Sequence, residues 1–145
     1  MNPYKAAERL LQDHEYHKSA VENLTKEIRE IESELPDGIR ATDYTQDKVT
    51  SSGPELTMVE QTAFKKLERI WEKQMHLERI KSKVERVERA LGTLEADEKI
   101  VLLMYYTNNQ PLYIIKVKIH KSYRTTGSIK REGMRNFVEA LYGEG

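Results

Sequence analysis

The sequence contains no cysteine among its 145 residues. Disulfide bonds, zinc sites built on cysteine and thiol catalysis are therefore excluded. Long apolar runs are missing too, because the longest, residues 100–106, is far too short to cross a bilayer. The first ten residues, MNPYKAAERL, lack the apolar core of a signal peptide. We therefore expect no membrane association and a cytoplasmic location.

The sequence also lacks the signatures of an enzyme. It has no glycine-rich phosphate loop, no nucleophile elbow and no convincing cluster of acidic and histidine residues at metal-binding spacing. His14 and His17 are three residues apart on a helical face, but two histidines make only half a metal site. We expect surface or seam histidines there, no catalysis, and neither a metal nor a cofactor.

One third of the residues are charged, and the mean hydropathy is −0.74. Such a composition favours solvated helices with narrow apolar seams. The net charge of zero hides an asymmetry: residues 111–145 carry seven Lys or Arg against three acids, a net of +4, so the other 110 residues sum to −4. A polyanion is therefore expected to contact only the C-terminal end.

Hydrophobic periodicity predicts an all-α fold that begins with a long antiparallel helical hairpin, residues 1–92. The first helix spans Tyr4 to Leu35, and the second runs from about residue 54 to Ala90, with a loop at about 37–54. The first helix carries a seam at 4-3-4-3-4 spacing: His17, Val21, Leu24, Ile28, Ile31 and Leu35. Trp71 is expected to seal the hairpin. So slim a pair has little core, so we expect a homodimer.

Residues 93–145 are predicted to form a second, helical domain. A helix over 94–106 follows Gly92, with Tyr105 and Tyr106 expected in the core, and Pro111 suits the first position of the next helix. Ser122 stands where an N-cap belongs, directly after a short connection. Four later residues recur at 3-4-4 spacing and are expected to face inward: Thr126, Ile129, Gly133 and Phe137. Two helices joined by a tight turn, after a supporting helix, have the layout of a helix-turn-helix.

The residues that point away from this inward face suit the recognition of double-stranded DNA. Arginine forks onto guanine edges in the major groove, and serine bonds to several bases. The predicted base-reading residues are Tyr123, Arg124, Gly127, Ser128 and Arg131. The predicted phosphate contacts are Lys118, Lys121, Ser122, Lys130 and Arg135. The alternative interpretation is a solvated basic helix that binds nothing.

The stretch LEADEKIVLLMYYTNNQPLYIIKVKIHKSYRTTGSIKREGMRNFVEAL resembles the C-terminal region of RinA/ArpU-type phage late transcriptional regulators. The likeness rests on an acidic stretch before paired tyrosines, on I-H-x-S-x-R-T at 119–125 and on I-K-R at 129–131, and the first helix resembles the family's opening helix. The resemblance implies a helix-turn-helix like that of sigma-70 region 4, and activation of phage late genes in a bacterial host cell. RNA polymerase is then a further candidate partner. The chain departs from the pattern at Lys116, Lys121 and Gly133.

Two other functions fit the same sequence. A small terminase-like DNA-packaging protein also joins a helix-turn-helix to oligomerising helices, and it would form a ring rather than a dimer. A helical protein-interaction module would use both segments to bind protein. That module would show no salt-sensitive affinity for DNA, whereas affinity of a DNA-binding protein falls steeply with salt.

Overall fold

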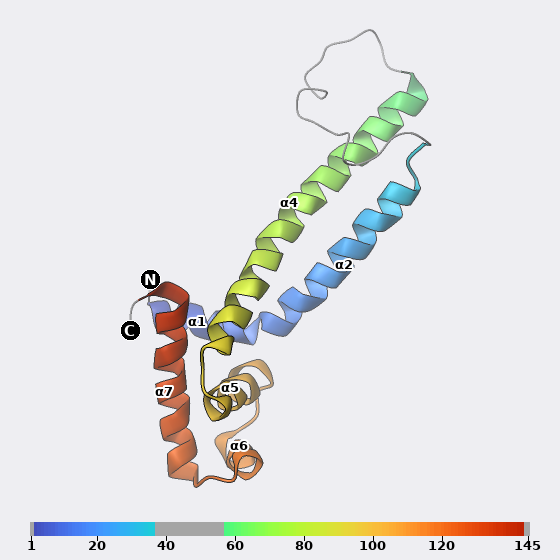
Figure 1. The fold of residues 1–145 in the computed structure, drawn as a ribbon. Coiled ribbons are helices and arrows are strands. Elements are labelled where there is room, and N and C mark those ends of the chain that lie inside the picture. Colours follow the sequence, from blue (N-terminus) through green and yellow to red (C-terminus); the bar gives the residue numbers. More distant parts are fainter. Residues whose placement is uncertain (1, 37–56, 144–145) are drawn as a thin grey trace. The chain divides into compact units, whose positions relative to one another are not determined.

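A computed structural model describes residues 2–36 and 57–143 of the chain. Every regular element in these ranges is a helix, which confirms the predicted all-α class for the part described. The elements are α1 (Pro3–Gln12), α2 (His14–Ser33), α4 (Met58–Gly92), α5 (Ala96–Leu102), the π-helical turn η2 (Leu103–Thr107), α6 (Leu112–Ile119) and α7 (Tyr123–Tyr142) (Figure 1). None of these helices combines the length and apolar character needed to span a membrane. The predicted loop at 37–54 lies outside the described residues.

The chain divides into two compact units, unit 1 (Met1–Lys18 and Ser82–Gly145) and unit 2 (Ser19–Lys81). The predicted domains, 1–92 and 93–145, place the division elsewhere, because unit 1 also takes in α1 and the last turns of α4. The physical reason is packing: Ala7 and Leu11 of α1 and Val87 of α4 are almost fully buried in one cluster with the C-terminal helices.

Unit 2 is a pair of helical segments, one from α2 and one from α4, that lie side by side (Figure 1). Its buried cluster consists of Ile28, Ile31 and Ile70, with Leu35 and Leu77 packed against it. This cluster lies on the predicted seam. The Trp71 side chain is 46% exposed, so the expectation that it seals the pair is wrong. Trp71 follows the buried Ile70 directly, and one residue turns the side chain about 100° around the helix axis.

Unit 1 is held together by a cluster of eleven buried residues that includes Phe137, which is fully buried. A second cluster, Val101, Ile115 and Ile119, packs α5 against α6. Polar contacts add to this packing: the Thr107 hydroxyl donates to the Leu11 carbonyl oxygen at 2.8 Å, and the Arg86 guanidinium donates to the Leu141 carbonyl oxygen at 3.0 Å. Helices from both ends of the chain therefore share one core.

The first predicted helix, Tyr4 to Leu35, is interrupted at Asp13, so that prediction is wrong at one residue. Asn2 caps α1, its side-chain oxygen accepting from the Tyr4 amide at 2.9 Å, and Pro3 occupies the first turn. Asp13 closes α1 by donating its amide proton to the Arg9 carbonyl oxygen at 2.9 Å. Aspartate competes with the helical backbone for hydrogen bonds, which makes it a common residue at such breaks.

The predicted helix over 94–106 begins later and ends in a wider turn. Glu95 is the N-cap of α5, and its amide donates to the Glu98 carboxylate at 3.1 Å. From Leu103 the chain follows the π-helical turn η2, which holds an extra residue relative to an α-turn. Tyr105 and Tyr106 pack edge to face, with ring centroids 4.9 Å apart. Tyr106 is buried and Tyr105 half-buried, so their assignment to the core is confirmed.

Candidate nucleic-acid interface

The connection between α6 and α7 is three residues long and tightly fixed. Pro111 caps α6 instead of forming its first residue, so the predicted start is wrong by one position. His120 ends α6 in the left-handed conformation, at φ 58°, which few residues other than glycine adopt. Its backbone amide donates to the Lys116 carbonyl oxygen. The direction in which α7 leaves α6 is therefore set by backbone geometry.

Ser122 is the N-cap of α7, which confirms that prediction. Its hydroxyl oxygen accepts from the Thr125 amide at 3.1 Å, and its hydroxyl donates to the Thr125 hydroxyl at 2.9 Å. Its carbonyl oxygen accepts from both the amide (2.9 Å) and the hydroxyl (2.8 Å) of Thr126, which is fully buried. The side chain that was predicted to touch phosphate is thus engaged in starting the helix.

The inward face of α7 follows the predicted spacing. Thr126, Gly133 and Phe137 are buried, and Ile129 is half-buried against the cluster between α5 and α6. Gly133 lies where a side chain would be crowded, because a Cβ atom there would lie 3.2 Å from the Cβ atom of Glu98. The missing side chain therefore lets α5 approach α7 closely.

Four polar residues form a continuous stripe on the outer side of α7. Arg124, Ser128, Arg131 and Arg135 are all exposed, and their 4-3-4 spacing places them on one face. Tyr123, 57% exposed, and the half-buried Gly127 lie beside the stripe. Within the stripe the Arg131 guanidinium donates to the Ser128 hydroxyl at 3.3 Å. The five predicted base-reading residues therefore lie together on the first three turns of the helix.

The predicted phosphate contacts are less alike than the sequence suggests. Lys118 and Lys121 are exposed, and neither makes an ion pair within the described residues. Arg135 pairs with Glu132 one turn before it, which offsets part of its charge. Lys130 is half-buried and points away from the stripe. Lys118 and Lys121 are the two cations best placed to reach an external anion.

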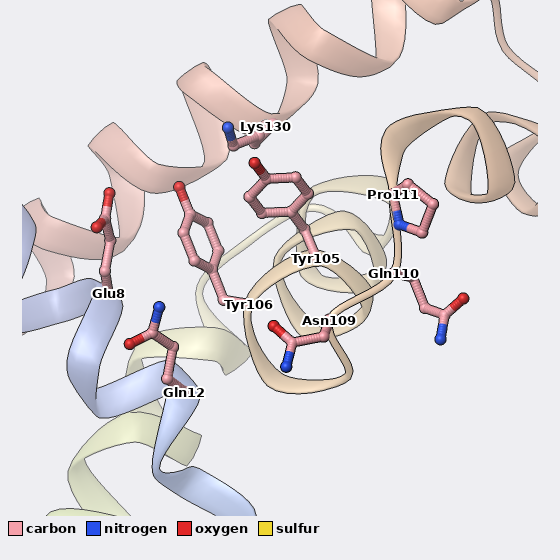
Figure 2. A pocket seen from close by; sticks show the side chains of 8 residues that line it. All are labelled: Glu8, Gln12, Tyr105, Tyr106, Asn109, Gln110, Pro111 and Lys130. Atoms are coloured by element: carbon pink, nitrogen blue, oxygen red, sulfur yellow. The ribbon is translucent and has the colours of Figure 1, made fainter.

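Lys130 belongs to a cleft of about 480 Å³ formed by α1, η2 and α7 (Figure 2). Its ammonium lies 4.0 Å from the ring centroid of Tyr105 and 5.7 Å from that of Tyr106, close enough for cation–π attraction. On the other side of the cleft, burial, followed by the charge of the nearby Glu8 carboxylate, raises the pKa of Tyr106 to about 12. Lys130 therefore stabilises the tyrosine pair.

An acidic hollow of about 450 Å³ borders the stripe on the side of α5. Four of its lining residues are acids, from the start of α5 and from α7: Glu95, Asp97, Glu98 and Glu132. Ser128 and Lys121 line the same hollow. Lys121 offsets part of this negative charge, so the hollow carries charges of both signs at the edge of the stripe.

Glu98 is a structural residue that sequence reasoning missed. Its side chain is only 7% exposed, and its carboxylate accepts from the Glu95 amide at 3.1 Å and from the Asn136 side-chain amide at 3.0 Å. An acid three residues into a helix is a capping-box signal, but the partner on α7 is 38 residues away. Together with Gly133, this contact fixes α7 against α5.

The outer face of α6 was also missed. Tyr113, Ile114 and Val117 are 60%, 42% and 66% exposed and lie on the side opposite the buried Ile115 and Ile119. The sequence carries the signal, because apolar residues occupy most positions of PLYIIKVKI. One face of an eight-residue helix cannot bury all of them, so some must be exposed. An exposed apolar face of this kind suits contact with another protein.

His14 and His17, which were expected at the surface or in a seam, are both at least partly buried. His14 is buried, 4% exposed, with Nε2 3.9 Å from a Glu88 carboxylate oxygen and Nδ1 lacking a hydrogen-bond partner. Burial, reinforced by the Lys18 charge, lowers the pKa of His14. His17 is half-buried. No group of three metal-ligating residues occurs in the part of the chain that the structure covers.

The chain matches no protein-family model, and no curated protein and no solved structure is significantly similar to it. The resemblance to RinA/ArpU-type regulators, and the site residues, therefore stay predictions that rest on the residues themselves.

Proposed function

We propose that the protein binds double-stranded DNA through the exposed stripe of α7 and regulates transcription. The observation that carries this proposal is the stripe itself, Arg124, Ser128, Arg131 and Arg135, which lies on the helix face opposite the buried Thr126, Gly133 and Phe137. A helix that keeps one face in a core and presents cations and hydroxyls on the other suits insertion into the major groove.

In this proposal α6, the three-residue turn and α7 act as a helix-turn-helix, with α5 as the supporting helix. Arg124 and Arg131 are one helical heptad apart and read base edges, while Tyr123, Gly127 and Ser128 lie against the groove. Lys118 and Lys121 contact flanking phosphates, and the N-terminus of α7 adds favourable dipole interactions with a phosphate. Arg135 and Lys130 contribute less, because each already has a partner within the protein.

The regulatory role rests on the sequence resemblance, which implies activation of phage late genes in the cytoplasm of a bacterial host. The helix segments of unit 2 act as an antiparallel hairpin and supply dimerisation, contact with RNA polymerase, or both. Among the described residues the ion pairs Glu27–Lys73 and Glu34–Lys66 support this arrangement, because Glu34, which directly follows α2, meets a residue earlier in α4 than Glu27 does. A dimer places two recognition helices on two half-sites.

The experiment is binding of the purified protein to fragments of its own genome across a salt series. Wild type is compared with Arg124→Ala/Arg131→Ala and with the control Arg69→Ala/Arg79→Ala, which removes two exposed arginines of unit 2. Each base-reading arginine is worth about 1–3 kcal/mol, so the first double variant is expected to weaken selective binding by at least ~30-fold. The control is expected to bind like wild type. Selection of no fragment, or equal loss in both variants, would refute base reading by the stripe.

A second candidate function, protein binding by the C-terminal helices, is favoured by the exposed Tyr113, Ile114 and Val117 of α6. It predicts that Val117→Asp abolishes the regulatory activity of the protein, whereas Arg124→Ala/Arg131→Ala retains it. It also predicts no salt-dependent DNA affinity. The two candidates are thus separated by one pair of variants.

A further inference from the structure

The helix pair of unit 2 has two edges that differ in chemistry. Along one edge, Lys73 Nζ lies 2.6 Å from a Glu27 carboxylate oxygen, and Lys66 Nζ lies 3.7 Å from a Glu34 carboxylate oxygen. Along the other edge no ion pair joins the two segments within the residues described. That edge instead exposes Trp71, whose side chain is 46% accessible, and Met75, at 49%.

A groove of about 500 Å³ runs along this second edge. Ile28 and Leu77, which belong to the seam of the pair, line it together with Trp71 and Met75. Two large, half-exposed apolar side chains beside a groove that reaches the seam are typical of an interface and atypical of a solvated helix.

The charged residues around the groove are of both signs. Arg29 and Glu32 line it from α2, and Glu78 lines it from α4. None of the three forms an ion pair with another residue in the described ranges. Under two-fold symmetry the same patch meets itself, so Arg29 of one copy can lie against Glu32 or Glu78 of the other.

We propose that this groove is the dimer interface of the protein, and that its occupant is the same edge of a second copy. Trp71 and Met75 of each copy enter the groove of the other, which produces a four-helix arrangement with a shared seam. The proposal deepens the dimerisation part of the proposed function, because it names the surface and the partner.

The size of the helix pair suits this role. The α4 segment of unit 2, residues 58–81, is about 36 Å long at a rise of 1.5 Å per residue, and the α2 segment, 19–33, is about 22 Å long. With helices about 10 Å wide, one face of the pair projects about 600 Å², which ridged side chains enlarge. A standard interface buries about 800 Å² on each partner. The two values are close enough for a stable dimer.

The single tryptophan of the chain, Trp71, reports directly on this interface. The experiment uses the full-length protein without DNA and measures its mass by analytical ultracentrifugation over a concentration series. The fluorescence emission of Trp71 is recorded on the same samples. Met75→Glu is compared with Met58→Glu, because Met58 is an exposed methionine of the same helix (78%) that does not line the groove. Circular dichroism checks that both variants keep their helices.

The expected result is a dimer whose formation moves Trp71 emission to shorter wavelength as the indole leaves water. Met75→Glu is expected to raise the dimer dissociation constant at least ~10-fold, while Met58→Glu leaves it unchanged. A monomer at every concentration, a ring-sized oligomer, or a dimer that both variants leave intact would overturn the proposal. DNA selection by the arginine stripe is measured separately, so failure of the dimer does not by itself refute DNA binding.

Discussion

Unit 1 and unit 2 are both made of amphipathic helices, but they bury their apolar faces in different ways. In unit 1, α1, α5, η2, α7 and the last turns of α4 contribute to a single cluster of eleven buried residues. In unit 2, two segments meet along one seam whose buried members are Ile28, Ile31 and Ile70. Helices that cross in several directions enclose a core, whereas a pair leaves its outer faces open. We therefore expect unit 1 to be stable alone and unit 2 to depend on a partner.

The largest expected effect is the loss of stability when a buried side chain is removed from the core of unit 1 or from the seam of unit 2. Phe137→Ala empties the centre of the unit 1 core and is expected to lower the free energy of unfolding by about 3–5 kcal/mol. Ile70→Ala in unit 2 is expected to lower it by about 2 kcal/mol, because a two-helix seam collapses more easily around a cavity. Urea unfolding followed by circular dichroism measures both. Equal losses would break the comparison between the units.

The two glycines of α7 test how tightly unit 1 is packed. Gly127→Ala meets only the Arg131 guanidinium, at 3.8 Å, and is expected to stabilise the protein by about 1 kcal/mol through helix propensity. Gly133→Ala gains the same propensity but places its Cβ atom 3.2 Å from that of Glu98. We expect the close contact to cancel the gain, leaving Gly133→Ala about 1 kcal/mol or more less stable than Gly127→Ala. Thermal unfolding of the two variants measures this difference. Equal stabilisation would show that α5 shifts to accommodate the added Cβ atom.

The pH dependence of the free energy of unfolding is expected to arise in unit 1, because the buried imidazole of His14 lies there. Burial lowers its pKa in the folded state below the 6.5 of the unfolded chain, and the neighbouring charges are Lys18, Glu88, Glu15 and His17. The unfolded chain then binds more protons. The contribution of His14 to the free energy of unfolding is therefore fully present above pH 6.5 and is lost as the pH falls from 6.5 toward the lowered pKa of the folded state.

His14→Gln is expected to flatten this dependence, measured as the free energy of unfolding between pH 7 and about 5. The control His76→Gln removes an exposed histidine of unit 2 and is expected to leave the slope as it is. A slope that survives in His14→Gln would assign the proton uptake to another group.

The smallest effect is expected at the paired edge of unit 2. Lys73→Ala removes the contact with Glu27, but both side chains remain partly exposed, so the expected loss is only about 0.2–1 kcal/mol. High salt is expected to erase most of the difference between variant and wild type. A loss comparable with that of Ile70→Ala would mean that charge, rather than the seam, holds the pair together.

The sequence predicted best those features that depend on local signals. The Ser122 cap and the inward spacing of Thr126, Gly133 and Phe137 were found because capping residues and helical period are written within one or two turns. The exposed arginines followed from the same period.

Features that depend on distant contacts were not predicted. Glu98 reads as a surface acid until Asn136, on another helix, lies beside it. The sequence alone predicts a free cation at Lys130, because only the fold places its ammonium against the tyrosine rings of η2. The place of Trp71 depended on which part of a wide apolar stripe the partner segment covers, and periodicity alone does not decide that.

The π-turn η2 has a consequence for insertions and deletions. Because it holds one residue more than an α-turn, deleting one residue within 103–107 would let the backbone close as ordinary α-helix. The residues after the deletion would keep the helix faces that they have now, because the deletion removes the extra residue and not the helical phase, and only the spacing around the tyrosine pair would change. A deletion in these five positions would therefore be tolerated by the rest of the helix more easily than a deletion elsewhere in it, and its effect would be confined to the cleft beside Tyr105 and Tyr106.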